Sequence, residues 1–224
     1  MNDEIRNKRL RLLIRRFNKQ RKQQAKQIDI LCNDIISAHK DFLKAVKTIS
    51  FAADFYNAIA GITDLNELLY TAGSSIQKHT PDIHVAFFLL IPSAVEGLVP
   101  GGMEEMPADN FELHVFESEH QLDLEERRIE NFFTSELVVN IAKSNRICTI
   151  DDMLGIGLQC SPACLEKLSV SAIPLSTQGS SSGFVLIYRS SQKPFTVEDL
   201  RAIAQIAPGL ARSIASCRAL VSSI

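Results

Sequence analysis

Residues 169–188 read SVSAIPLSTQGSSSGFVLIY. Two short runs, 170–175 and 183–188, are mainly apolar, and the seven residues between them are serine, threonine, glutamine and glycine. Short apolar runs joined by a polar turn are typical of two antiparallel strands. We therefore expect a β-hairpin at the centre of the globular part of the chain.

Further elements are expected on both sides of this hairpin. Short β-branched or aromatic runs predict strands at 83–91, 111–116 and 147–150, and apolar residues at helical spacing predict helices at 65–76, 122–143 and from 196 onward. Thr63-Asp64 and Thr196 stand at cap positions before two of these helices. Three glycines and three prolines predict a loop at 92–110, and we expect an irregular stretch at 155–162 followed by a helical turn at 164–168.

The first 60 residues contain neither glycine nor proline and predict one long helix. Stepping alternately four and three residues from Leu10 to Ile59 visits fifteen positions, of which only Arg21 and Gln24 are not apolar. This heptad pattern predicts a coiled coil with a second copy, rather than a helix packed only on its own domain. We call these positions the seam. The expected dimer contacts are Leu31, Ile35, Phe42 and Ile49, together with Leu210 and Ile214 on a similar stripe of the last helix.

These patterns divide the chain into a basic amphipathic helix at 1–60 and an α+β domain at 61–224. Residues 1–27 hold ten Lys/Arg against two acidic residues, a net charge of +8, which leaves −10 for residues 28–224. Such an arm suits an anionic partner, so residues 6–26 could contact nucleic acid weakly or lie on an anionic membrane surface. A charged coiled-coil end that meets a protein partner is the plainer interpretation.

Composition limits the cellular setting. No apolar run reaches about 18 residues without a charge, which argues against a transmembrane segment. The N-terminus lacks the apolar stretch of a secretory signal. Five cysteines in 224 residues are too few and of the wrong parity for a disulfide scaffold, so we expect a cytoplasmic protein.

Residues from about 62 to 222 resemble a GAF domain, a small-ligand and signalling domain related to PAS folds. Three stretches carry the resemblance: 138–152, which reads VVNIAKSNRICTIDD, the hairpin quoted above, and 194–200, which reads PFTVEDL and opens the last helix. The resemblance implies an antiparallel sheet of five to six strands with flanking helices, preceded here by the long coiled-coil helix. It also implies a dimer joined through those helices and a ligand pocket over one face of the sheet.

Little of the family's chemistry transfers to this sequence. The Asn-Lys-Phe-Asp-Glu signature of cyclic-nucleotide-binding members is absent, and neither Cys160 nor Cys164 is followed by the histidine of bilin-binding members. The cysteine spacing also differs from that of the free-methionine-sulfoxide reductases. No nucleophile, paired carboxylates or glycine-rich phosphate loop stands out, so we expect a protein that is not an enzyme, and the sequence indicates no particular cofactor.

The candidate pocket residues are His114, Phe116, Phe133, Cys148, Cys160 and Cys164. Cys160 and Cys164 could form a reversible disulfide, supply metal ligands with Cys148, or be ordinary reduced side chains. His114 could face the pocket, and the phenylalanines could line it or pack the core. Asp151-Asp152 could hold a cation, although such a pair more often caps a helix.

The leading hypothesis is a homodimeric sensor in a bacterial cytoplasm, which relays a small-ligand or redox signal to a separate output protein. Two alternatives remain. In one, side chains fill the pocket and the protein is a non-catalytic assembly adaptor. In the other, Cys160 and Cys164 serve a thiol-dependent enzyme.

Overall fold

The computed structural model describes residues 2–91, 111–116, 129–160, 167–177 and 180–221. In chain order the elements are α1 (Asn2–Ile59), α2 (Leu65–His79), β1 (His84–Leu90), β2 (Phe111–Phe116), the 3-10 helix η1 (Ile129–Phe132), α3 (Ser135–Ser144), β3 (Cys148–Thr149), α4 (Ile150–Ile156), β4 (Leu168–Thr177), β5 (Ser180–Ser190) and α6 (Val197–Val221). The loop expected at 92–110 lies outside these ranges. The helical turn expected at 164–168 lies largely outside them as well, and Leu168 is the first residue of β4.

The described strands form one antiparallel sheet in the order β2-β1-β5-β4-β3. The expected α+β architecture, with a five-stranded antiparallel sheet and flanking helices, is confirmed. The central hairpin is also confirmed, and its strands are longer than the apolar runs alone predict because serines and Thr177 extend the pairing toward the turn.

A glycine allows β1 and β5 to approach closely. Gly183 has φ +135°, and a Cβ there would lie 1.9 Å from the carbonyl oxygen of Phe88. A register shift at Leu175/Ser176 lies opposite this position in β4. Only glycine fits both the backbone angle and the contact.

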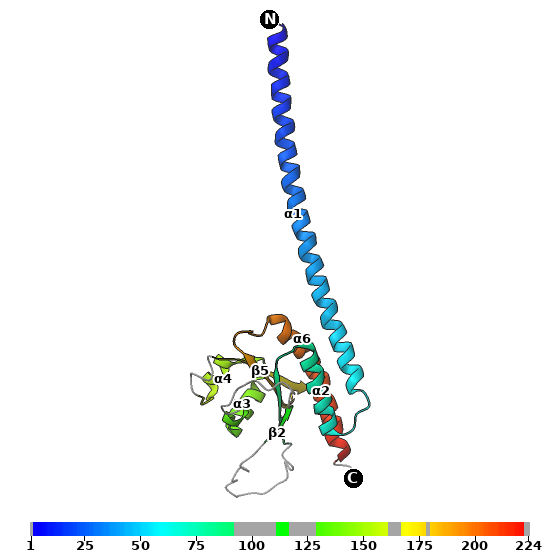
Figure 1. The fold of residues 1–224 in the computed structure, drawn as a ribbon, viewed down its shortest axis with the longest axis vertical. Coiled ribbons are helices and arrows are strands. Elements are labelled where there is room, and N and C mark those ends of the chain that lie inside the picture. Colours follow the sequence, from blue (N-terminus) through cyan, green and yellow to red (C-terminus); the bar gives the residue numbers. More distant parts are fainter. Residues whose placement is uncertain (1, 92–110, 117–128, 161–166, 178–179, 222–224) are drawn as a thin grey trace. The chain divides into compact units, whose positions relative to one another are not determined.

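The two faces of the sheet carry separate apolar clusters. Figure 1 shows α2 and α6 on one side of the sheet and α3 and α4 on the other. The first lies under α2, α6 and the last turns of α1, and it takes Val85, Phe87 and Leu89 from β1. The second lies under α3 and α4 and takes Ala86 and Phe88 from the same strand. This alternation follows from the two-residue period of a strand. The helices packed on the sheet therefore cover one face each: α2, α6 and the end of α1 cover the first, and α3 and α4 the second.

Side chains that accept backbone hydrogen bonds fix where the helices begin. Asp64 accepts from the N–H of Glu67 at 2.8 Å, and Thr196 accepts from that of Asp199 at 3.1 Å, so both predicted caps are confirmed. Gly61, with φ +81°, follows the end of α1 as predicted.

Three sequence predictions are wrong between residues 129 and 157. The single helix expected over 122–143 is interrupted, because Thr134 caps a new helix by accepting from the N–H of Leu137. The region expected to be irregular from Gly155 begins inside α4, which starts at a capping box formed by Thr149 and Asp152. Ile150, expected in a strand, is the first residue of that helix.

The chain divides into two compact units, Met1–Ile49 and Ser50–Ile224. The sequence predicts this boundary at residue 60, where the helix ends. Packing divides the chain eleven residues earlier, after Ile49, because Phe51, Ala52, Phe55 and Ile59 are buried in the first apolar cluster.

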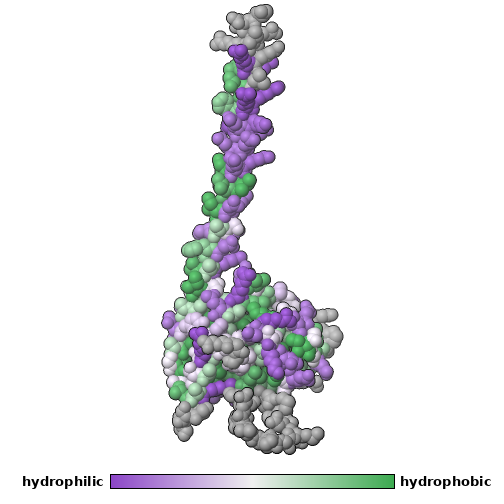
Figure 2. Space-filling view, turned by 180° about the vertical axis from the view of Figure 1, so that it is seen from behind, coloured by the Kyte–Doolittle hydropathy of each residue, from purple (hydrophilic) through white to green (hydrophobic). Residues whose placement is uncertain are grey.

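Within the first unit the seam residues are exposed. Leu31, Ile35, Phe42 and Ile49 are 59%, 68%, 64% and 62% exposed, and Figure 2 shows apolar groups recurring along one side of this helix. The corresponding stripe of α6 differs, because Leu210 and Ile214 are 1% and 0% exposed within their own domain. Their side chains belong to the first apolar cluster, so they offer no free surface to a second copy.

Among the described residues, no helix has the length and apolar character needed to cross a membrane.

Candidate functional site

A pocket of about 450 Å³ lies between α2 and the strands β1 and β2. Its lining residues are Asn66, Leu69, Tyr70, Phe87, His114, Val115 and Phe116. We call it the α2–β2 pocket. It lies on the side of the sheet that α2, α6 and the end of α1 cover.

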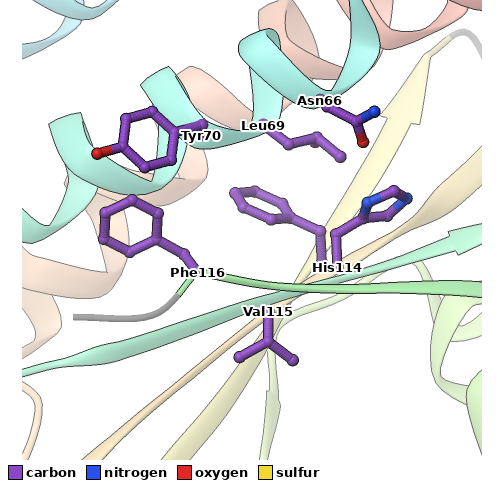
Figure 3. A pocket seen from close by; sticks show the side chains of 7 residues that line it. Asn66, Leu69, Tyr70, His114, Val115 and Phe116 are labelled. Carbon is purple, nitrogen blue, oxygen red and sulfur yellow. The ribbon is translucent and has the colours of Figure 1, made fainter. Parts of the chain in front are cut away.

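The pocket has an aromatic end and a polar end (Figure 3). Tyr70 on α2 lies above Phe116 on β2, with ring centroids 5.3 Å apart. Asn66, also on α2, lies above His114. The side chain of Val115 points away from the pocket, because successive side chains of a strand alternate between the two faces of the sheet, and it packs against the second apolar cluster.

Phe116 fixes how closely α2 approaches the sheet. A Cβ on Gly73 would lie 2.6 Å from Cγ of Phe116, so a glycine is required on α2 where this ring packs. Buried Phe87 and Leu69, 1% and 2% exposed, supply further apolar wall. The ring and the helix backbone are therefore in direct contact at the pocket's edge.

His114 belongs to a polar chain that reaches α6. Arg218 of α6 donates to Oε2 of Glu112 at 2.9 Å and to the carbonyl oxygen of Leu90 at 2.6 Å. The same Glu112 oxygen lies 3.6 Å from Nε2 of His114, which is too long for a hydrogen bond. That nitrogen is buried and has no hydrogen-bond partner among the described residues. Nε2 of His114 is therefore available for a hydrogen bond to another group.

The other predicted pocket residues lie on the opposite face of the sheet. Phe133 packs on Phe88 and Phe184, with ring centroids 4.9 and 6.1 Å away, and Cys160 packs against the same cluster. Cys148 is fully buried there. The six predicted residues therefore do not share one cavity: His114 and Phe116 line the α2–β2 pocket, three lie across the sheet, and Cys164 lies outside the described residues.

The buried thiols are held by local contacts. Sγ of Cys148 lies 3.2 Å from Oγ of Ser144 and donates to the carbonyl oxygen of Arg146 at 3.6 Å. On α6, burial raises the pKa of the Cys217 thiol, and the nearby Asp64 carboxylate adds to the shift. Cys217 consequently stays protonated, and it donates to the carbonyl oxygen of Ile62.

The acidic pair after β3 has a structural role. Asp152 accepts from the backbone N–H of Thr149 at 2.9 Å, which lowers the pKa of its carboxyl, and it pairs with Arg146 at 2.9 Å. Asp152 thus completes the capping box of α4, whose N-cap is Thr149, and both aspartates lie in the first turn of this helix. Across the part of the chain that the structure describes, no three His, Cys, Asp or Glu side chains are grouped as a metal site would require.

The sequence did not predict five of the seven lining residues: Asn66, Leu69, Tyr70, Phe87 and Val115. One sequence feature that indicated this site was Gly73, because a glycine inside a helix allows another side chain to pack closely against the helix backbone. The partner in that approach comes from β2, more than forty residues later, and no local pattern identifies it.

No family model matches this sequence, and no curated protein matches it either. The fold is similar to that of solved GAF domains. The GAF domain of a phosphoenolpyruvate-protein phosphotransferase from Coxiella burnetii is 15% identical, with a TM-score of 0.51 over 80% of this chain and 98% of that one. That from Acinetobacter is 12% identical, with a TM-score of 0.48 over 79% of this chain and 98% of that one.

The chromophore-binding domain of a bacteriophytochrome from R. palustris is also similar, at 12% identity and a TM-score of 0.45 over 79% of this chain and 62% of that one. At these identities the similarity is one of fold. The globular part of the chain has the fold of a GAF domain, as the sequence resemblance implies.

Proposed function

We propose that the chain is a sensory module that binds a small ligand in the α2–β2 pocket and relays its presence through the helices on the same side of the sheet. The position of the pocket carries this proposal. One wall is α2, which shares an apolar cluster with α6 and the end of α1. The other wall is β2, which is ion-paired to α6 through Glu112 and Arg218.

The lining residues define the ligand by size and chemistry. Phe87, Leu69 and Phe116 suit a flat, largely apolar molecule, and a volume of about 450 Å³ lies in the ordinary range for small-molecule pockets. His114 and Asn66 at the polar end suit one hydrogen-bonding group on that molecule. We therefore propose an aromatic or heterocyclic ligand with a single polar edge.

The relay begins where the pocket walls meet the helices. A ligand in contact with Phe116 would press on the ring that packs against Gly73, and so on the backbone of α2. A ligand that bonds to His114 would act beside Glu112, which Arg218 holds from α6. Both movements reach α6, because interior packing is dense and transmits displacement.

The relay continues from α6 to α1. The Tyr56 hydroxyl donates to the carbonyl oxygen of Gln205 at 3.3 Å, and a Cβ on Gly209 would lie 2.1 Å from Cε1 of the tyrosine ring. Pro208 stands beside this contact and cannot donate a helical hydrogen bond. This junction is the place where a shift in α6 would change the last turns of α1.

We also propose that the chain is a homodimer joined along the part of the seam of α1 between Ile28 and Ile49, with a separate output protein that responds to the change, in the cytoplasm of a bacterium. The exposed heptad residues between Ile28 and Ile49 support the pairing. We propose a binding role and no catalytic one. A redox signal within the α+β domain would act through Cys160 and Cys164, because Cys148 and Cys217 are buried.

A second candidate is a non-catalytic adaptor. The α3-facing side of the sheet favours it, because Phe88 and Phe184 stack there at 4.8 Å and are both completely buried. In that case the α2–β2 pocket would be a surface hollow without a ligand. The two candidates differ in whether the purified protein carries a small molecule.

Native mass spectrometry of the full chain under reducing conditions tests the proposal. The variant Asn66→Trp places an indole at the pocket mouth from an exposed position, and Lys78→Trp is a matched control on the exposed surface of the same helix. We expect extra mass on the wild type and on K78W, and none on N66W. A bare wild-type chain would favour the adaptor, and extra mass on N66W would put the ligand elsewhere.

The thiol alternative has its own test. The double variant C160S/C164S should retain the same bound mass as the wild type. Loss of the bound molecule in this variant alone would indicate that the ligand binds at the segment that contains Cys160 and Cys164.

A further inference from the structure

The N-terminal part of α1 carries an exposed apolar stripe that is distinct from the rest of the seam. Leu10, Leu13, Ile14 and Phe17 are 57%, 51%, 52% and 63% exposed. Their spacing of three, one and three residues places them on one face of the helix. Leu13 widens this face beyond the seam positions Leu10, Ile14 and Phe17.

The same segment is strongly and uniformly basic. Residues 9–26 contain eight basic side chains and no acidic one: Arg9, Arg11, Arg15, Arg16, Lys19, Arg21, Lys22 and Lys26. All eight are exposed. Residues 28–49, by contrast, hold three lysines and three aspartates, so their charges balance.

This difference affects what can cover each part of the helix. A second copy aligned in parallel along residues 28–49 meets a balanced surface. Farther toward the N-terminus the pairing would bring eight positive charges against eight, and two successive seam positions there are Arg21 and Gln24. Like charges oppose such a contact, and polar residues weaken the seam. The apolar stripe on the N-terminal side of Arg21 is therefore best covered by a negatively charged surface.

We infer that residues 9–26 bind the surface of an anionic lipid bilayer, with Leu10, Leu13, Ile14 and Phe17 inserted among the lipid chains and the basic side chains at the headgroups. A helix with an apolar stripe and a Lys/Arg-rich opposite face is the form that lies in a membrane interface. Four to eight basic residues on such a helix are typical of binding to anionic lipids. The inference does not depend on the ligand pocket.

Nucleic acid fits the segment less well. Phosphates would satisfy the charges but leave four large apolar side chains in water, and Phe17 is the single aromatic residue in 9–26 that could stack on bases. An anionic bilayer provides contacts for both the basic and the apolar side chains of this segment. Membrane binding and nucleic-acid binding thus predict different results in the same assay.

Vesicle co-sedimentation of the full-length chain tests the inference. The probes are vesicles of phosphatidylcholine alone and of phosphatidylcholine mixed with phosphatidylglycerol. We expect binding to the mixed vesicles, weakening as salt rises. Removal of three charges in R15Q/R16Q/K19Q should lower the partition constant about a hundredfold, at about fivefold per charge.

Matched variants separate the stripe from the rest of the helix. L13Q changes the stripe without changing a seam position and should lower binding about tenfold, whereas V46Q, on an exposed residue of the balanced segment, should leave it unchanged. K40Q/K44Q/K47Q, which removes three charges from that segment, should also have little effect. Since these side chains are exposed, circular dichroism should report the same helix content throughout.

Three results would overturn the inference: no binding to the mixed vesicles, equal binding to both kinds of vesicle, or equal losses from the two triple variants. Binding of a polyadenylate probe without vesicle binding would replace the bilayer with nucleic acid.

Discussion

Charging the seam of α1 tests the proposed pairing of two copies. The perturbation is the double variant I35K/F42K, which puts two ammonium groups on the face that the heptad spacing assigns to a partner chain. Ile36 and Leu43 are 53% and 47% exposed and lie one residue further along the helix, off the seam. I36K/L43K is therefore a control with the same number of charges on the same helix.

The size of the effect follows from the exposed surface. Ile35 and Phe42 are 68% and 64% exposed in the single chain, so about two thirds of each side chain remains to be buried. At about 1.5–3 kcal/mol for complete burial, this gives about 1–2 kcal/mol per side chain, or about 4–8 kcal/mol for the four in a pair. Loss of this contribution should raise the dissociation constant at least about a thousandfold.

Sedimentation-equilibrium measurements over a range of concentrations provide the assay. The wild type and I36K/L43K should sediment as dimers at concentrations where I35K/F42K is a monomer. Far-ultraviolet circular dichroism should be the same for both variants, because the changed residues are exposed. A dimer that survives in I35K/F42K, or that dissociates equally in the control, would refute the assignment of the seam.

Two further predictions concern the domain itself. Gly183→Ala should lower the free energy of unfolding by at least about 2 kcal/mol in urea titrations, because its Cβ would meet the carbonyl oxygen of Phe88 at a positive φ. Gly155→Ala should instead raise it by about 0.5–1 kcal/mol, because a Cβ there has nothing within 4 Å and alanine favours the helix α4. Similar changes in both variants would contradict this interpretation. Burial lowers the pKa of His79 below its ordinary 6.5, so the unfolded chain takes up a proton more readily and stability should fall as pH drops below about 6.5. His79→Phe keeps a ring against Phe51 and should flatten the dependence of melting temperature on pH between about 7.5 and 5; an unchanged slope would assign it to another group.

Much of the fold follows from local sequence patterns. The strands at 84–90 and 111–116 were predicted because runs of apolar and β-branched residues are short there and are bounded by turns. Asp64 and Thr196 were identifiable as caps because their roles depend on residues three positions away. The break between η1 and α3 was missed because apolar residues continue through it, although Thr134 and the residues after it carried a cap signal.

Interactions between distant residues were harder to predict. The stripe of α6 shows that Leu210 and Ile214 lie on an apolar face, but helical spacing does not say whether a sheet or a second helix covers that face. In the structure the first apolar cluster covers it. The α2–β2 pocket is similar, because Tyr70 and Phe116 are more than forty residues apart in the sequence and meet only when the domain has folded.

Hydrogen–deuterium exchange tests the central claim, that occupancy of the α2–β2 pocket is communicated to α1 and α6. The measurement compares the full-length wild type, N66W and K78W, and follows residues 50–59 and 200–218. We expect the loss of the bound ligand in N66W to change exchange in both segments, around the Tyr56–Gly209 contact, while K78W exchanges as the wild type does. Changes confined to α2 and β2 in N66W, with both segments unaltered, would contradict the relay.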